Sequence, residues 1–146
     1  MKMTWTALFV GTIIFLSSFK FSSDDKLMGI WWNTEKDAKI EIYRCGEVLC
    51  GKVVWLRNPN DDNGNPVKDE NNVESQLKKR EVMGMKVLEG FNFNGKNRWV
   101  DGEAYDPKSG KTYTSYISLK DINTLELRGY IGTPIFGKTV VWKRDK

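Results

Sequence analysis

The stretch Gly29-Ile30-Trp31-Trp32 opens the first predicted strand, and Trp142-Lys143-Arg144 lies near the end of the last one. A Gly-x-Trp at one end of the chain and an arginine at the other are typical of a sheet whose first and last strands are neighbours. Such a sheet closes into a barrel. We therefore expect Trp31 and Arg144 to stack as a cation–π pair across this seam, and we assign both a structural role.

The residues between these stretches alternate between apolar and polar side chains with a period of two, which is typical of half-buried strands. Short turn signals such as Asn94-Gly95 and Asp106-Pro107 separate most of them. The sequence predicts eight strands, at residues 30–33, 39–45, 51–56, 86–93, 98–105, 111–119, 124–131 and 137–144. Eight strands joined by short turns predict an all-β fold, an eight-stranded antiparallel up-and-down barrel.

One connection, residues 57–80, is much longer than the others. Its first part is rich in Asn, Asp, Gly and Pro, and Val73 to Lys79 can form one or two helical turns. Loops of this length in compact domains are usually functional or mobile. A calcium loop is an alternative, with Asp61, Asn63 and Glu70 as ligands, but Pro59 then occupies the first ligand position. We favour a solvated loop and predict no metal site.

The N-terminus reads as a targeting segment. Lys2 precedes an apolar run that ends near Phe19, so we predict a signal peptide at residues 1–23 and a single barrel domain at 24–146. Lys20 and Phe21 make a poor cleavage site, which leaves an uncleaved anchor open as the alternative. We expect a periplasmic or secreted protein with no membrane contact beyond this segment.

Charge and composition exclude several classes of function. The formal net charge is +4, and it falls to +2 without Lys2 and Lys20, which is too little to indicate binding to nucleic acid. The chain has no histidine, so Ser-His-Asp catalysis, Cys-His catalysis and histidine-ligated metals are excluded. We expect no enzyme activity and no cofactor.

Both cysteines lie in one short segment, Cys45-Gly46-Glu47-Val48-Leu49-Cys50. Two closely spaced cysteines in an exported chain predict a disulfide. Four residues separate them, whereas a redox Cys-x-x-Cys motif has two. We therefore predict a structural Cys45–Cys50 bond at the base of a hairpin.

Several groups of residues along the chain carry a family resemblance. They are Ile42 to Gly46, Leu49 to Leu56, Asp69 with Asn72, Leu77, Arg80 and Gly84, Tyr105 to Lys111 with Tyr113, Leu127 to Gly132, and Phe136 to Thr139 with Trp142 and Arg144. Together they resemble the DUF2147 family of exported bacterial proteins. The sequence departs from that pattern at Glu81-Val82, where the family commonly has a proline, and in its Asn- and Asp-rich loop. The resemblance implies a calycin, or lipocalin-like, barrel and an exported location, but no mechanism.

Aromatic and polar side chains on the strands are the candidates for a ligand site. Five tryptophans follow the signal segment, and we select Trp55 and Trp99 as ligand contacts, with the alternative that they only fill the barrel. Tyr113, Tyr130 and Arg128 resemble the tyrosines and arginine with which small intracellular lipid binders hold a carboxylate, and we select Tyr113 and Arg128 as ligand contacts. Alternation places Arg128 on the face opposite Leu125 and Leu127, so a solvated position is also open.

A carboxylate pair supplies an enzymatic alternative. By alternation Trp99, Asp101, Glu103 and Tyr105 share one strand face. If that face points inward, Asp101 and Glu103 can run acid–base chemistry such as glycoside hydrolysis, with Arg128 as a candidate partner. If it points outward, Val100, Gly102 and Ala104 line the interior, where small residues fit well.

The leading interpretation is an exported barrel that binds a small apolar or amphipathic ligand without catalysis. This interpretation rests on fold analogy. The first alternative is a structural or protein-interaction module of the envelope with a filled barrel, whose partner is unknown. The second is a carboxylate-based hydrolase.

Overall fold

The computed structural model describes residues 26–146, so the predicted signal peptide lies outside the described residues. The described chain contains eight strands and two short 3₁₀ helices: β1 (Gly29–Trp32), β2 (Ala38–Cys45), β3 (Val48–Leu56), η2 (Leu77–Lys79), β4 (Lys86–Phe93), β5 (Arg98–Asp106), β6 (Lys111–Asp121), β7 (Thr124–Tyr130), η3 (Pro134–Phe136) and β8 (Lys138–Arg144).

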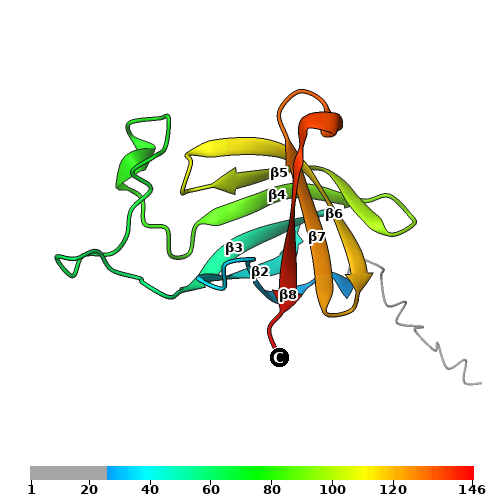
Figure 1. The fold of residues 1–146 in the computed structure, drawn as a ribbon, viewed down its shortest axis with the longest axis horizontal. Coiled ribbons are helices and arrows are strands. Elements are labelled where there is room, and N and C mark those ends of the chain that lie inside the picture. Colours follow the sequence, from blue (N-terminus) through cyan, green and yellow to red (C-terminus); the bar gives the residue numbers. More distant parts are fainter. Residues whose placement is uncertain (1–25) are drawn as a thin grey trace, which may run out of the picture.

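The strands form a closed barrel in which each strand pairs with its sequence neighbours (Figure 1). All pairings are antiparallel, and β1 pairs with both β2 and β8. In the β1–β8 seam Trp31 lies opposite Arg144, and the Arg144 guanidinium carbon lies 4.2 Å from the centroid of the Trp31 ring. The predicted barrel, its strand number and its closure are therefore confirmed.

Strand boundaries differ from the predicted ones mainly around the disulfide. β3 begins at Val48 rather than at residue 51, because Gly46 and Glu47 alone make the turn and Gly46 adopts a φ of 74°. Cys45 and Cys50 form the predicted disulfide across this β2–β3 hairpin. In the long loop, the helical turns expected at 73–79 reduce to η2.

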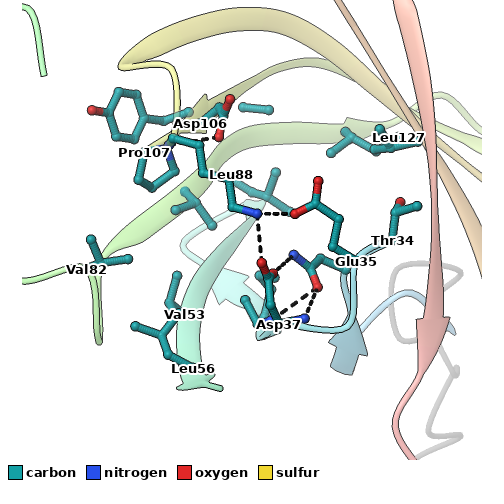
Figure 2. Close-up of a pocket in the computed structure, with 18 of the residues that line it drawn as sticks. Thr34, Glu35, Asp37, Val53, Leu56, Val82, Leu88, Asp106, Pro107 and Leu127 are labelled. Atoms are coloured by element: carbon teal, nitrogen blue, oxygen red, sulfur yellow. Dashed lines mark hydrogen bonds and ion pairs between the residues drawn. The ribbon is translucent and has the colours of Figure 1, made fainter. Parts of the chain in front are cut away.

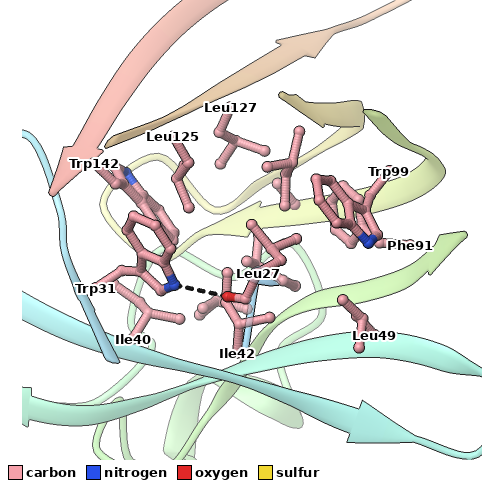
Figure 3. Packing of buried hydrophobic residues seen from close by; sticks show 14 of the residues in the cluster. Leu27, Trp31, Ile40, Ile42, Leu49, Phe91, Trp99, Leu125, Leu127 and Trp142 are labelled. Atoms are coloured by element: carbon pink, nitrogen blue, oxygen red, sulfur yellow. Dashed lines mark hydrogen bonds between the residues drawn. The ribbon is translucent and has the colours of Figure 1, made fainter. Parts of the chain in front are cut away.

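The hydrophobic core fills one end of the barrel (Figure 3). Its largest fully buried side chains are Trp31, Trp99 and Phe91, and the indole N–H of Trp31 donates to the carbonyl of Leu27 at 2.9 Å. The predicted alternation of β7 holds here, since Leu125 is fully buried. The barrel is thus plugged at one end by bulky side chains, which leaves the other end for a cavity.

A bulge in β5 changes which of its residues face inward. The pairing with β6 shifts register between Trp99 and Gly102, and Asp101 adopts a φ of 61°. The bulge leaves both Trp99 and Ala104 buried, although strict alternation puts them on opposite faces. The predicted shared face of Trp99, Asp101 and Glu103 was therefore wrong.

Candidate binding cavity

A cavity of about 680 Å³ occupies the open end of the barrel. Its walls come from the inner faces of most strands, and Figure 2 shows Val53, Leu88 and Leu127 among them. The apolar side chains of the wall are Ala38, Ile40, Val53, Leu56, Val67, Val82, Val87, Leu88, Ala104, Leu127, Val140 and Trp142. Because most of these residues are small or branched, space remains inside the barrel.

An ion-paired lysine spans the mouth of this cavity. Lys108 belongs to the β5–β6 turn, and its Nζ donates to Glu35 and, at 2.7 Å, to Oδ2 of Asp37 in the β1–β2 loop (Figure 2). In a closed eight-stranded barrel these two connections lie on opposite sides of the mouth. We call Lys108, Glu35 and Asp37 the mouth bridge.

Asn33 holds the Asp37 end of the mouth bridge in place independently of Lys108. Asn33 Nδ2 donates to Asp37 Oδ1 at 2.6 Å, and the Asn33 side-chain oxygen accepts from the backbone N–H groups of Asp37 and Ala38. Partial burial raises the pKa of Asp37, but the hydrogen bonds from Lys108 and Asn33 and the charge of Lys108 outweigh this effect. The pKa of Asp37 is lowered overall, so the ionised form is favoured.

A buried polar network anchors the 57–80 loop to the barrel wall. Asp69 is fully buried; its Oδ1 accepts from the Tyr105 hydroxyl at 2.5 Å, and its Oδ2 accepts from Asn72 Nδ2 and from Arg80 Nε, both at 2.8 Å. Burial raises the pKa of Asp69, yet these hydrogen bonds and the Arg80 charge lower it overall. Burial, together with the hydrogen bond to Asp69 and its charge, raises the pKa of Tyr105. The paired carboxylate is therefore held as the anion.

A second contact ties the loop to the turn that carries Lys108. Asn71 Nδ2 donates to the carbonyls of Pro107 and Lys108, and the Gly110 Cα lies close under the Asn71 backbone, where an added Cβ would come within 1.8 Å of the Asn71 carbonyl oxygen. The part of the 57–80 loop around Asn71 is therefore packed against the β5–β6 turn at the rim.

Three side chains bring a polar group to the apolar wall: two hydroxyls and one indole N–H. Tyr113 and Ser115 lie on the inner face of β6, and Trp142 lies deeper on β8. Ser115 Oγ donates to the Tyr113 carbonyl at 3.1 Å. Among residues 26–146 no hydrogen bond satisfies the Tyr113 hydroxyl or the Trp142 indole N–H, and both residues line the cavity. These groups are available to a polar part of a ligand.

The structure brings only one of the four predicted ligand residues, Tyr113, to this cavity. Trp99 is 1% exposed and packs on Phe93 near the plugged end, with ring centroids 5.1 Å apart. Trp55 lies on the outer wall, 5.2 Å from the Trp32 ring. The β-bulges of β2, β3 and β5 shift these faces, so the expected inward placement of Trp55 and the expected ligand contact of Trp99 are corrected.

Arg128 is also outside the cavity. Its guanidinium donates to the Pro134 carbonyl at 2.6 Å and to Thr139 Oγ1 at 3.0 Å, on the outer face of β7 and β8. Asp101 and Glu103 are exposed on the outer wall of β5. Arg128 therefore pairs with neither carboxylate, and the inward carboxylate pair that the hydrolase alternative requires is not formed.

The acidic loop folds on itself. Asp61 Oδ1 accepts the backbone N–H groups of Asn63 and Asn65, each at 2.9 Å, as turn-forming Asp residues commonly do. Glu70 lies apart from this turn, on the rim of the cavity. Within residues 26–146 no group of three or more His, Cys, Asp or Glu side chains is arranged to hold a metal ion.

Sequence reasoning missed the residues of the mouth. Glu35, Asp37 and Lys108 lie in turns that appeared only as connections, and Lys138 appeared only as the start of a strand. The available signal was the topology, since alternate turns of an up-and-down barrel gather at the same end.

Within the described chain no helix has the length and apolarity needed to cross a membrane.

The closed barrel, its plugged floor and its apolar cavity define a lipocalin-like barrel. A solved structure described as protein HP1028 from the human pathogen Helicobacter pylori, belonging to the lipocalin family, superposes on this chain with a TM-score of 0.69. The two share 25% sequence identity over 82% of this chain and 83% of that one. Residues 29–144 match the profile of DUF2147, described as an uncharacterized protein conserved in bacteria, and the chain belongs to this family. A search of curated proteins found no match.

Proposed function

We propose that the protein binds a small apolar or amphipathic molecule inside its barrel, without chemical conversion. The observation that carries this proposal is the cavity of about 680 Å³ with an apolar wall and a polar, charged mouth. Binding sites for small molecules are commonly concave, of roughly 300–1,000 Å³, and mostly apolar with a few polar groups that set orientation. The similarity to a lipocalin-family structure supports the same function by analogy.

The apolar depth of the cavity favours a hydrocarbon portion of the ligand. Ile40, Val53, Leu88 and Leu127 offer no hydrogen-bonding side chain, so an apolar group gains free energy when it leaves water for this wall. The polar groups of the mouth are close to solvent, where the head of an amphipathic molecule remains hydrated. The cavity therefore fits a molecule with one apolar end better than a fully polar one.

We place the protein outside the cytoplasm, in the periplasm or secreted. The Cys45–Cys50 disulfide supports this location, because disulfides persist mainly in oxidising compartments. The apolar run before Phe19 supports it from the sequence.

Native mass spectrometry of the protein purified from its own cells tests the function. We expect a reproducible added mass that leaves on denaturation, and its fragmentation gives the chemical class of the ligand. A uniformly ligand-free mass, together with no binding of the neutral fluorescent probe N-phenyl-1-naphthylamine, would contradict the proposal.

A second candidate, a protein-interaction module, is favoured by one specific surface. Ile131, Ile135 and Phe136 in the β7–β8 connection are 64%, 82% and 85% exposed. The Arg128 hydrogen bonds to the Pro134 and Ile135 carbonyls hold this connection in place. An ordered exposed apolar group of this kind is typical of a contact surface. Loss of a co-purifying protein on Phe136→Ser, with probe binding unchanged, would support this candidate.

A further inference from the structure

We propose that the cavity takes an amphipathic molecule with an anionic head, and that Lys138 and Tyr113 hold this head at the mouth. The inference rests on the proposed function, because it names the class of ligand for the same cavity. It is carried by the placement of Lys138, a mouth cation that forms no ion pair within residues 26–146 and lies on a strand above the apolar wall.

Lys138 is the first residue of β8 and lies on the inner face of that strand. Alternation along β8 places it on the same side as Val140 and Trp142, and all three line the cavity, while Thr139 points outward to Arg128. Within residues 26–146 the Lys138 ammonium makes no ion pair and no hydrogen bond. The β8 wall therefore runs from a free cation at the mouth to apolar groups below it.

Tyr113 approaches the same part of the mouth from β6. Gly129 of β7 pairs with Ser115 of β6 on one side and with Lys138 of β8 on the other. At this level, therefore, no β7 side chain separates the inner face of β6 from that of β8. Tyr113 packs directly on this glycine, where an added Cβ would lie 3.1 Å from the Tyr113 Cβ. The unpaired Tyr113 hydroxyl can donate one hydrogen bond to an anion whose charge Lys138 balances.

Three acids of the mouth, Glu35, Asp37 and Asp106, are bonded to groups of the protein itself. Glu35 and Asp37 share Lys108 in the mouth bridge. Asp106 accepts hydrogen bonds from Ser109 Oγ at 2.7 Å and from the Lys108 backbone N–H at 3.1 Å. The acids at this part of the mouth are therefore already engaged.

The last two mouth charges oppose each other. Lys68 and Glu70 lie two residues apart on the 57–80 loop, with opposite signs, and both line the cavity. Lys68 thus has an acid beside it on the exposed loop, whereas Lys138 lies on a strand directly above the apolar wall and is the cation placed to meet a ligand head. An anionic head at Lys138 places the tail against Val140 and Leu127 on the neighbouring inner faces.

The test uses four probes with the same twelve-carbon tail: dodecanoate, dodecyl phosphate, 1-dodecanol and dodecylamine. Each displaces N-phenyl-1-naphthylamine from the full-length mature protein at neutral pH. We expect both anions to bind about fivefold more tightly than the alcohol, and the amine to bind most weakly, since a solvent-exposed ion pair is worth up to about that factor. Dodecanoate and dodecyl phosphate distinguish a carboxylate from a phosphate head.

Variants separate Lys138 from general charge effects. Lys138→Met should reduce the preference for anions over the alcohol to about one, and Lys138→Arg should restore it. Lys120→Met removes the same charge from the outer wall and should leave the preference unchanged. Tyr113→Phe should weaken the anions by about threefold without a matching loss for the alcohol.

Equal affinity for anions and alcohol in the unmodified protein, tighter binding of the amine, or an unchanged preference in Lys138→Met would overturn the inference while the proposed function stands. If the fluorescent probe and all four ligands fail to bind, the proposed function fails and the inference fails with it.

Discussion

The Arg144 guanidinium lies 4.2 Å from the centroid of the Trp31 ring and closes the floor of the barrel. Its three nitrogens donate to the carbonyls of Ile122, Met28 and Lys26, so one side chain joins the β6–β7 turn to the segment before β1. Burial lowers the pKa of Arg144, but an arginine remains charged at any ordinary pH. The pair therefore links the two ends of the chain.

Replacing Arg144 with methionine should destabilise the barrel by about 3 kcal/mol, because the stacking and the hydrogen bonds to three carbonyls are lost together. Urea unfolding followed by tryptophan fluorescence measures this change. Arg128→Met is a matched control, since Arg128 also donates to carbonyls but lies exposed on the outer wall; its loss should cost less than about 1 kcal/mol. Equal effects of the two variants would contradict a special role for Arg144.

The contact between Gly110 and Asn71 predicts an unequal response of two turn glycines. Gly110 and Gly95 both have positive φ, at 69° and 80°, but only Gly110 has a backbone atom within reach of an added Cβ. Gly95→Ala should cost about 1 kcal/mol from strain alone, whereas Gly110→Ala should cost about 3 kcal/mol or more because the loop must move. Thermal unfolding measures both, and similar losses would show that the loop is not packed on this turn.

The buried Asp69 network predicts a pH dependence of stability. The folded-state pKa of Asp69 is below its ordinary value of 3.8, so its ionised form contributes stability above that value and loses it as the pH falls through the folded pKa. Asp69→Asn should therefore be less stable than the unmodified protein at neutral pH, by about 3 kcal/mol, and the gap should narrow toward low pH. Urea unfolding from neutral pH to about pH 3 follows this gap.

The exposed Asp62 provides the control for that series. Asp62→Asn should match the unmodified protein at every pH. A gap between Asp69→Asn and the unmodified protein that stays constant over the acidic range would mean that the carboxylate charge of Asp69 does not carry the stability.

The mouth bridge predicts faster ligand exchange when it is removed. Lys108→Met breaks the contact with Glu35 and Asp37. Both the association and the dissociation rate of N-phenyl-1-naphthylamine should then rise by about threefold, because the free energy of an exposed ion pair is small. The dissociation constant should change little, because the apolar wall is intact. Stopped-flow fluorescence measures both rates. Unchanged rates would show that the bridge does not restrict the mouth.

Reduction of the Cys45–Cys50 bond should lower stability by only about 2 kcal/mol, because the loop it closes is short. The Cys45→Ser, Cys50→Ser double variant should keep the barrel, as judged by circular dichroism and by the fluorescence of its buried tryptophans. Complete unfolding of this variant would mean that the hairpin depends on the bond far more than loop closure explains.

Much of the fold was predictable because barrel closure leaves a clear pattern. The alternation of Leu125, Leu127 and Gly129 gave the inner face of β7, and the pair of Trp31 and Arg144 gave the seam. The bulge at Asp101 was not predictable, because it depends on how β5 pairs with β6 and not on the composition of the strand. The extra residue of this bulge turns the side chains of Asp101 and Glu103 to the outer face of the barrel.

The binding cavity was less predictable than the barrel. Tyr113 was selected by its resemblance to the carboxylate sites of small lipid binders, and its alternation with Ser115 and Ile117, which are buried in the structure, puts it on the inner face of β6. Arg128, selected by the same resemblance, lies on the outer face, while Lys138 supplies the inward cation across Gly129. Lys108 and Glu35 are distant in sequence and meet only because barrel closure gathers their turns at one mouth.

If the apolar cavity is the binding site, a larger side chain that fills part of it must weaken binding. Ala104 lines the cavity, so Ala104→Phe should fill part of it and weaken N-phenyl-1-naphthylamine binding by at least about tenfold. Val141→Phe adds similar bulk to the exposed outer wall and should bind as the unmodified protein does. If Ala104→Phe retains its fold, as shown by an unchanged circular dichroism spectrum, and binds the probe with unchanged affinity, the ligand does not enter the barrel.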